Sequence, residues 1–152
     1  MCVARCSLAK RTNHTPVIFC GLRFPSPLPH TCVCPCGRFR CQCVGVEIDE
    51  ERLTRARERI DALAVEDPEV QTLVTLRNVS IFEEIEGLMN AKLIVMYLFR
   101  EAMQSMAGRM KGMLSDVVVV AIGFKLPGYI AAQEIVEGAV RAYVYKIEKC
   151  KT

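Results

Sequence analysis

The sequence predicts an α/β fold: a doubly wound, mainly parallel sheet with an irregular N-terminal extension. From residue 41 onward, short apolar runs that suit strands alternate with longer segments of helical period, a pattern typical of parallel sheets. Residues 1–40 contain five of the seven prolines and lack a regular period, which argues against helix and central strand there. We therefore divide the chain into an irregular, Cys- and Pro-rich segment, 1–40, and a folded domain, 41–152.

The most informative strand is predicted at residues 41–48, which are largely apolar and lead into two carboxylates, Glu47 and Asp49. Asp49 suits the N-cap of a helix over residues 50–65, because its side chain can accept a hydrogen bond from a first-turn N–H. Apolar residues recur on one face of that segment, and Pro68 marks its end. The strand and the helix together begin the regular alternation.

The remaining elements follow from apolar runs, helical periods and turn residues. They are strands at 72–77, 93–99 and 116–124, a Met-rich helix at 101–114, a short helix or loop at 130–137 and a final strand at 139–147. The strand at 93–99 is apolar on both faces, as a strand covered by helices must be. The last strand follows another strand through a short connection, so it is a candidate antiparallel edge.

No apolar run approaches the ~20 residues that a membrane helix needs, so no membrane span is predicted.

The charge distribution restricts the expected location and partners of the chain. Residues 1–46 carry six basic and no acidic residues, as a mitochondrial transit segment or a solvated extension can. The location is therefore left open between mitochondrion and cytoplasm. The basic residues are spread along the segment and not clustered, so nucleic acid is not the expected partner.

Eight of the nine cysteines lie in residues 1–43. No signal peptide is recognised, so a disulfide scaffold is not indicated. A zinc site is the alternative, since Cys32, Cys34, Cys36, Cys41 and Cys43 are close in sequence. Their Cys-x-Cys spacing differs from the two separated Cys-x₂₋₄-Cys pairs of structural zinc sites. We predict no metal site, and we interpret the last two cysteines as small apolar residues of a strand core.

The acidic end of the first predicted strand points to a nucleoside-containing ligand. In open α/β sheets, ligands bind beyond the carboxyl ends of the strands. In dinucleotide-binding sheets, an acidic residue at the end of the second strand can hydrogen-bond the two hydroxyls of a ribose, and the strand at 41–48 would occupy that position. Glu47 is the candidate for this contact. The alternative is that Glu47 is a solvated charge at a strand end. Asp49 is interpreted as the helix N-cap only.

These elements resemble the class I S-adenosylmethionine-dependent methyltransferases over residues 41–148. Residues 44–49, Val-Gly-Val-Glu-Ile-Asp, are similar to the second-strand motif of that family. The resemblance implies S-adenosyl-L-methionine as cofactor, with Glu47 binding its ribose and Ile48 beside it. It also places Val79, Ser80 and Ile81 at the adenine, where the family usually has Asp or Asn and this chain has the shorter, uncharged serine.

A narrower resemblance connects the chain to a group of protein-lysine methyltransferases with archaeal and mitochondrial members. It rests on residues 95–98, Val-Met-Tyr-Leu, on residues 124–129, Phe-Lys-Leu-Pro-Gly-Tyr, and on the closing strand at 142–146. This resemblance implies a protein substrate whose lysine side chain receives the methyl group. Tyr97 is the candidate catalytic residue that lines the lysine channel; its alternative is a buried strand aromatic. No general base is predicted.

The chain departs from the family at its N-terminus, where neither the first strand nor the Gly-x-Gly-x-Gly turn is found. Only glycine lets the backbone of that turn approach the cofactor closely. The predicted fold is therefore a truncated Rossmann-like sheet, and the chain is expected to be an enzyme that truncation could inactivate. Two alternatives stay open: a non-catalytic remnant of the fold that acts as an interaction module, and a Cys-rich metal-binding protein.

Overall fold

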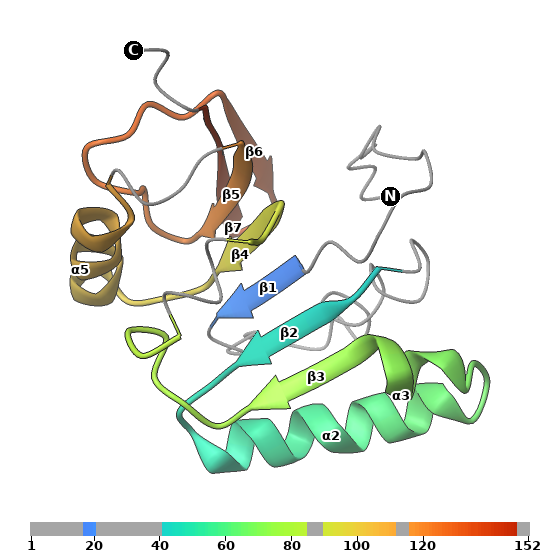
Figure 1. The fold of residues 1–152 in the computed structure, drawn as a ribbon. Helices are drawn as coiled ribbons and strands as arrows, with labels where there is room; N and C mark the ends of the chain where they lie inside the picture. The colour runs from blue at the N-terminus through green and yellow to red at the C-terminus, as the bar shows by residue number, and fades with distance from the viewer. Residues whose placement is uncertain (1–16, 21–40, 85–89, 112–115, 149–152) are drawn as a thin grey trace.

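The structure is a computed structural model, and it describes residues 17–20, 41–84, 90–111 and 116–148. The described strands form one seven-stranded sheet in the order β3-β2-β1-β4-β5-β7-β6 (Figure 1). They are β1 (Val17–Cys20), β2 (Cys43–Val46), β3 (Val74–Arg77), β4 (Leu93–Met96), β5 (Val117–Ile122), β6 (Gln133–Glu137) and β7 (Val140–Ile147). The first five strands pair in parallel, and β7 runs antiparallel to both of its neighbours. The predicted mainly parallel, doubly wound α/β sheet is confirmed.

The expectation that the sheet lacks its first strand is wrong. Strand β1 lies within the segment predicted to be irregular, and it pairs in parallel with β2 on one side and with β4 on the other. Its sequence, Val-Ile-Phe-Cys, is short but rich in residues that favour strands. The glycine-rich turn would follow β1 in residues 21–40, which lie outside the described residues. The division of the chain at residue 40 therefore stays a prediction.

The C-terminal half contains one more strand than predicted. Residues 130–137 were expected to form a short helix or a loop, but Gln133–Glu137 is β6, which is the edge strand. Strand β7 is antiparallel, as predicted, but it is not the edge. All five residues of β6 are exposed, so no buried apolar face marks this strand in the sequence. The hairpin turn contains Gly138 with φ +58°, a conformation that glycine adopts without steric cost.

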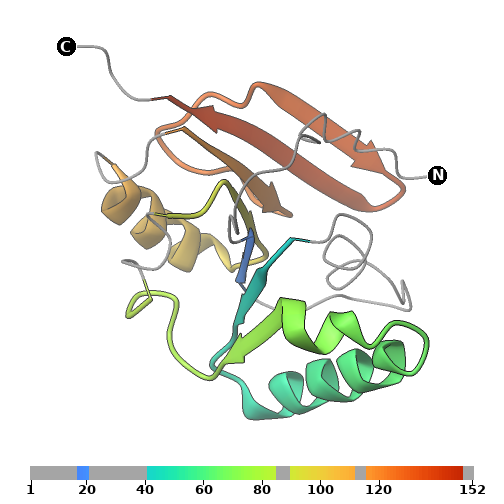
Figure 2. The same ribbon diagram turned by 45° about the vertical axis from the view of Figure 1, so that its right-hand side comes forward.

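Helices cover the two faces of the sheet. Helix α2 (Glu50–Ala64) and the short α3 (Glu69–Leu73) lie along β3, whereas α5 (Arg100–Met110) lies beside β4 and β5 (Figures 1 and 2). The Asp49 side chain caps α2 by accepting the Arg52 N–H, as predicted. Three methionines of α5 are buried in the main core. The stripe of methionines is thus core packing, as the sequence suggested, although 112–115 lie outside the described residues.

The main core lies between α5 and one face of the sheet. It includes Val46, Ile94, Met96, Met103, Met106, Met110, Val119 and Tyr145, all at most 2% exposed. A smaller cluster on the other face surrounds Cys43, with Cys41, Val74 and Leu93 packed against it. Cys43 is buried among apolar residues, as the interpretation expected, but it is also disulfide-bonded and is therefore not only a small apolar residue. Among the described residues, no group of three or more His, Cys, Asp or Glu side chains could hold a metal ion.

None of the helices in the described residues has the combination of length and apolar character that a membrane span requires.

One buried polar contact ties β7 to the loop that follows β5. The Tyr145 hydroxyl accepts a hydrogen bond from the Leu126 N–H at 2.8 Å, and both residues are buried. The Tyr145 ring also meets Tyr129 edge to face, with 6.4 Å between the ring centroids. A buried N–H that loses its acceptor carries the full cost of its desolvation. Tyr145 therefore fixes the course of this loop.

We expect Tyr145→Phe to lower the free energy of unfolding by about 1–3 kcal/mol, because the ring still fills the core while the Leu126 N–H loses its acceptor. Urea denaturation of the variant and the wild type at neutral pH measures this difference. Equal midpoints and slopes would contradict it.

The same two proteins should also differ in pH dependence. Burial raises the pKa of the Tyr145 hydroxyl above its ordinary value of about 10, and the hydrogen bond from Leu126 opposes this in part. A pKa raised in the folded state contributes stability that is present below about pH 10 and is lost as the pH rises through the folded pKa. Phenylalanine does not titrate, so the stability advantage of the wild type should narrow above about pH 10.

Candidate functional site

The parallel strands end together at one edge of the sheet. In the strand register, Arg77, Val46, Cys20, Met96 and Ala121 form one row across β3, β2, β1, β4 and β5. The residues that follow this row lie at the carboxyl edge, where ligands of open α/β sheets bind. The backbone order thus defines the site before any side chain is considered.

Two predicted site residues follow this row directly. Glu47 comes after Val46 on β2, and Tyr97 comes after Met96 on β4, with β1 between the two strands. Strands are ~4.8 Å apart, so the backbones of Glu47 and Tyr97 are separated by about 10 Å across β1. The structure therefore brings the predicted cofactor and catalytic residues to the same edge, on either side of the central strand.

Glu47 is the only buried residue with a charged side chain in the described part of the chain, with 5% of its surface exposed. Its Oε1 accepts hydrogen bonds from the N–H groups of Ile48 and Asp49, each at 3.0 Å. Its own N–H donates to the carbonyl oxygen of Arg77 at 3.2 Å. The alternative of a solvated strand-end charge is therefore wrong. The strand end holds the carboxylate in one orientation.

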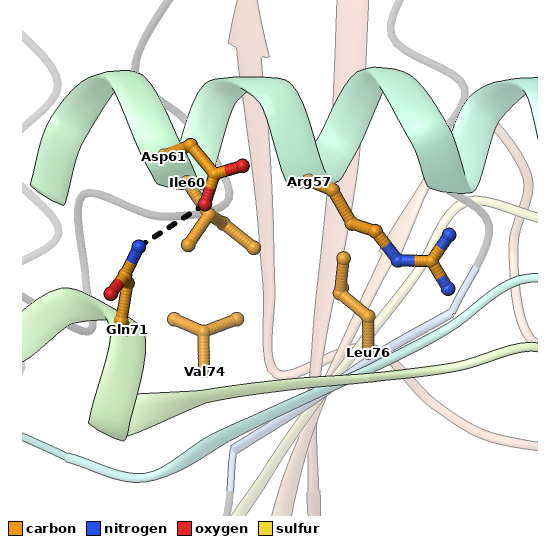
Figure 3. Close-up of a pocket in the computed structure, with 6 residues that line it drawn as sticks. All are labelled: Arg57, Ile60, Asp61, Gln71, Val74 and Leu76. Carbon is orange, nitrogen blue, oxygen red and sulfur yellow. Dashed lines mark hydrogen bonds between the residues drawn. The ribbon is translucent and has the colours of Figure 1, made fainter.

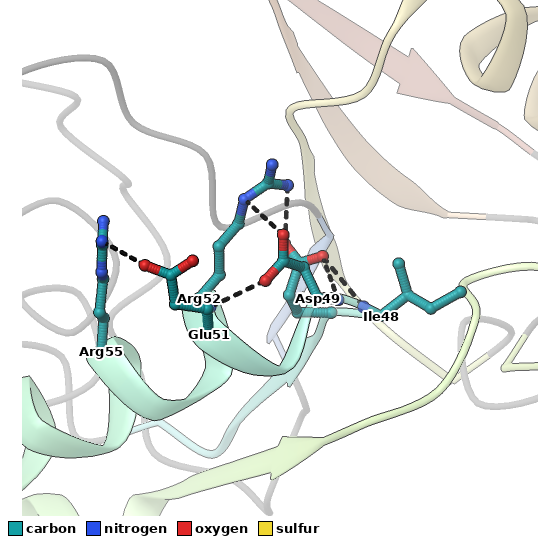
Figure 4. A network of polar contacts seen from close by, with 6 residues as sticks. Ile48, Asp49, Glu51, Arg52 and Arg55 are labelled. Atoms are coloured by element: carbon teal, nitrogen blue, oxygen red, sulfur yellow. Dashed lines mark hydrogen bonds and ion pairs between the residues drawn. The ribbon is translucent and has the colours of Figure 1, made fainter.

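Arg52 completes this acidic strand end, and the sequence analysis did not identify it. Its Nη1 lies 3.9 Å from Oε2 of Glu47, and its Nε lies 3.4 Å from Oδ2 of Asp49. Figure 4 shows the Arg52 guanidinium turned back toward these carboxylates, while Glu51 pairs separately with Arg55. The spacing of Asp49 and Arg52, three residues apart at a helix start, is the signal that could have predicted the pair. Arg52 provides a counter-charge for the buried carboxylate.

Ile48 is 70% exposed, although it is a large apolar residue next to the most buried charge of the site. Its side chain points away from the polar network in Figure 4. An apolar side chain that faces solvent at a ligand edge offers a surface on which a flat ring can pack. The structure therefore leaves the predicted contact of Ile48 available.

The three residues predicted at the adenine lie on the loop that follows β3. Ile81 is buried in the main core, and Val79 packs against that core. Ser80 is half-buried, and its Oγ accepts the Phe82 N–H at 3.3 Å. Only the serine thus presents a polar side chain near the carboxyl edge, and its contact with a ligand stays a prediction.

This loop is fixed by contacts that the sequence did not reveal. Arg109 of α5 donates to the Phe82 carbonyl oxygen at 3.3 Å, and its guanidinium lies 5.1 Å from the Phe82 ring centroid. Arg77 and Glu84 form an ion pair across the two ends of the loop. The loop is therefore held to both β3 and α5.

Tyr97 is half-buried beside the end of β5. A Cβ added to Gly123 would lie 3.7 Å from Cε2 of Tyr97, so the ring packs along that glycine. Two residues further along, Phe99 is 59% exposed. The guanidinium of the following residue, Arg100, lies 5.7 Å from the ring centroid of Phe124, which is on the loop after β5. The loops after β4 and β5 therefore meet around Tyr97.

A separate hollow of about 280 Å³ lies between α2, α3 and β3 (Figure 3). Its lining residues are Arg57, Ile60, Asp61, Gln71, Val74 and Leu76. A hydrogen bond of 3.2 Å from Gln71 Nε2 to Asp61 Oδ1 crosses it. Val74 begins β3, so the hollow extends toward the amino ends of the strands and not to the carboxyl edge. We do not assign the site to it.

No protein-family model matches the sequence, and no curated protein matches it. Solved structures do share its architecture. An RNA methyltransferase from Salinibacter ruber, in complex with S-adenosyl-L-homocysteine, superposes with a TM-score of 0.70 at 18% identity, covering 91% of this chain and 84% of its own. The chain has the fold of the class I S-adenosylmethionine-dependent methyltransferases.

Two further structures with this methyltransferase fold support the assignment. Streptococcus pneumoniae Sp1610, a putative tRNA (m1A22) methyltransferase in complex with S-adenosyl-L-methionine, gives a TM-score of 0.63 at 12% identity, over 93% of this chain and 70% of its own. The C-terminal domain of precorrin-6Y C5,15-methyltransferase from Rhodobacter capsulatus gives 0.58 at 13%, over 92% and 84%. At such identities the likeness concerns the fold alone.

We expect Glu47→Ala to lower the free energy of unfolding by about 1–3 kcal/mol, because two backbone N–H groups lose their acceptor. Glu47→Gln should cost less, since an amide oxygen can accept the same bonds. Thermal or urea unfolding of the two variants measures the difference. If alanine and glutamine cost the same, the acceptor role of Oε1 is incorrect.

Proposed function

We propose that this chain binds S-adenosyl-L-methionine at the carboxyl edge of its sheet and transfers the methyl group to a lysine side chain of a protein. The observation that carries the proposal is the buried, oriented carboxylate of Glu47 at the end of β2. Structures of the same fold were solved with S-adenosylmethionine or S-adenosylhomocysteine bound, which supports the choice of cofactor.

Glu47 would accept hydrogen bonds from the ribose hydroxyls, since an ionised carboxylate provides several acceptor sites. Ile48 would pack against the base, and Ser80 would offer a hydroxyl near its rim. The cofactor itself supplies the electrophilic methyl group, so the chain has to bind, orient and exclude water.

Tyr97 would orient the attacking amine on the other side of β1. A lysine must lose its proton before it can attack, and a channel of low polarity lowers the pKa of an amine. The phenolic oxygen of Tyr97 can accept a hydrogen bond from that amine. The resemblance of residues 95–98 and 124–129 to protein-lysine methyltransferases supports lysine as the acceptor.

A second candidate acceptor is RNA, because two of the structures compared above are named as RNA or putative tRNA methyltransferases. The exposed Phe99 and the cation of Arg100 could stack on unpaired bases. The third candidate is a fold that binds no cofactor. It is favoured by the sequence between β1 and β2, where Gly21 and Gly37 are the only glycines.

We expect Glu47→Gln to weaken S-adenosyl-L-methionine binding about ten- to a hundredfold, because the loss of charge-assisted hydrogen bonds costs about 1.5–3 kcal/mol. Calorimetry on the full chain measures it. Asp49→Asn is the matched control, since it also neutralises a carboxylate of this strand end but keeps a good N-cap. Starting affinity is expected to be weak without a glycine-rich turn. Binding that is unaffected by Glu47→Gln would remove the proposed contact, and no binding at all would favour the third candidate.

We expect Tyr97→Phe to slow methyl transfer about ten- to a hundredfold without changing the affinity for the cofactor, because only a hydrogen bond to the amine is lost. Transfer of labelled methyl groups to a cell extract, with protein and RNA fractions counted separately, measures the rate and identifies the acceptor. Label in RNA alone would exclude lysine. An unchanged rate would exclude the role of the Tyr97 hydroxyl.

A further inference from the structure

The β6–β7 hairpin gathers exposed apolar side chains. Seven large hydrophobic residues are exposed in the described chain, and four lie in or beside this hairpin: Ile130, Ile135, Val136 and Val140. Strand β6 is exposed along its whole length and is the last strand of the sheet. Exposed apolar residues that are gathered on one element mark an interaction surface, whereas scattered ones do not.

The hydrogen bonds of β7 show which backbone groups of β6 face outward. The Arg141 carbonyl oxygen accepts the Gly123 N–H at 2.8 Å, so Arg141 faces β5. Backbone groups alternate in direction along antiparallel strands, so the N–H and C=O of the next residue, Ala142, face β6. Ala142 pairs with Ile135, whose backbone groups therefore face β7. The residues on either side of that partner, Glu134 and Val136, therefore point their N–H and C=O groups to the open edge.

This edge is only partly protected against strand addition. Edge strands are commonly protected by charged side chains, above all lysines, and by prolines or bulges. Strand β6 reads Gln-Glu-Ile-Val-Glu, so it has two glutamates but no lysine or proline. Its charges are Glu134 and Glu137, and Arg141 of β7 pairs with Glu134 at 3.4 Å. The edge is therefore apolar with a small negative charge.

The charge selects among the possible occupants. A second copy of the chain would bring the glutamates of two β6 strands to one seam, where like charges repel. Phosphates of a nucleic acid would meet the same glutamates. An extended peptide with apolar and lysine side chains would fit all three features of the edge. Its backbone would hydrogen-bond the outward groups of β6, its apolar side chains would pack on Ile135 and Val136, and a lysine would pair with Glu137.

The edge lies within reach of the proposed transfer site. The hairpin extends past the end of β5, on the carboxyl side of the sheet (Figure 2). A strand added outside β6 would be four strand spacings from β4, about 19 Å from the backbone of Tyr97. An extended chain spans that distance with roughly six residues.

We propose that β6 is the docking strand for an extended, lysine-bearing segment of the protein substrate, which adds to the sheet edge and places a lysine roughly six residues away at Tyr97. The identity of the partner as substrate rests on the function proposed above, whereas the docking of the peptide does not.

The test uses two synthetic peptides and amide hydrogen exchange of the full chain. One peptide is acetyl-Thr-Lys-Val-Lys-Val-Lys-Thr-amide, and the other has Glu in place of each Lys. The lysine peptide should slow the exchange of the Glu134 and Val136 amides specifically, since that of Ile135 already faces β7. No change at a millimolar concentration of the lysine peptide, or an equal effect of the Glu peptide, overturns the proposal.

Val136→Pro and Val136→Thr form a matched pair of variants. Proline removes an outward N–H that β7 does not use, so it is compatible with an edge strand. Threonine keeps the N–H and the β-branched shape. We expect proline to weaken binding of the lysine peptide at least about tenfold and threonine to leave it nearly unchanged. Equal affinities, with both variants folded by circular dichroism, overturn the proposal.

Two controls separate the outcomes. Cofactor binding, by calorimetry, and methyl transfer are measured independently of peptide binding. If the lysine peptide binds at β6 but neither cofactor binding nor methyl transfer is detected, the docking site stands and the identification of the partner as a substrate is wrong. Sedimentation equilibrium tests the second copy as occupant. A dimer that Val136→Pro dissociates would show that the edge is self-paired and would overturn the proposal.

Discussion

The buried carboxylate of Glu47 is the constraint on which the site depends. A charge that is removed from water must be paired and hydrogen-bonded, because an uncompensated one costs several kcal/mol. Here the two N–H groups that follow the strand supply the hydrogen bonds, and Arg52 supplies the counter-charge. The bend of the chain at Ile48 and the N-cap of α2 at Asp49 are therefore coupled to the Glu47 side chain. In the proposed function, local folding and cofactor binding therefore use the same carboxylate.

The parallel register extends this local arrangement into a site. Because β2 and β4 both pair with β1 at Cys20, the residues after Val46 and Met96 emerge at the same height. The central strand thus sets the distance between Glu47 and Tyr97, and no loop has to define it. A short strand of four residues is sufficient, since its neighbours on both sides supply the hydrogen-bond ladder.

The sequence predicted the parts of the fold that bury a regular apolar face. Strand β2 and the methionine stripe of α5 were found because burial imposes a period on the residues, and the cap at Asp49 was found from the preference of N-caps for Asp. Strand β1 was missed because its four residues lie among prolines and cysteines, and β6 because an edge strand exposed on every residue has no such period. The site followed the same rule. Glu47 was identified from its position, whereas the Arg109–Phe82 contact joins residues 27 apart and has no local signature.

The two halves of the sheet are stabilised in different ways. In the proposed reaction, one half binds the cofactor and the other half binds the methyl acceptor. The proposed cofactor side relies on contacts within β2, β3 and the loops that follow them, and on Arg109 of α5. The acceptor side relies on Tyr145, which reaches from the antiparallel β7 to the loop after β5 through a buried hydrogen bond. That loop begins at Gly123, against which Tyr97 packs. The antiparallel strands therefore do more than complete the sheet. They support the wall of the site that contains Tyr97, because the Arg141 carbonyl oxygen of β7 accepts the N–H of Gly123, against which Tyr97 packs.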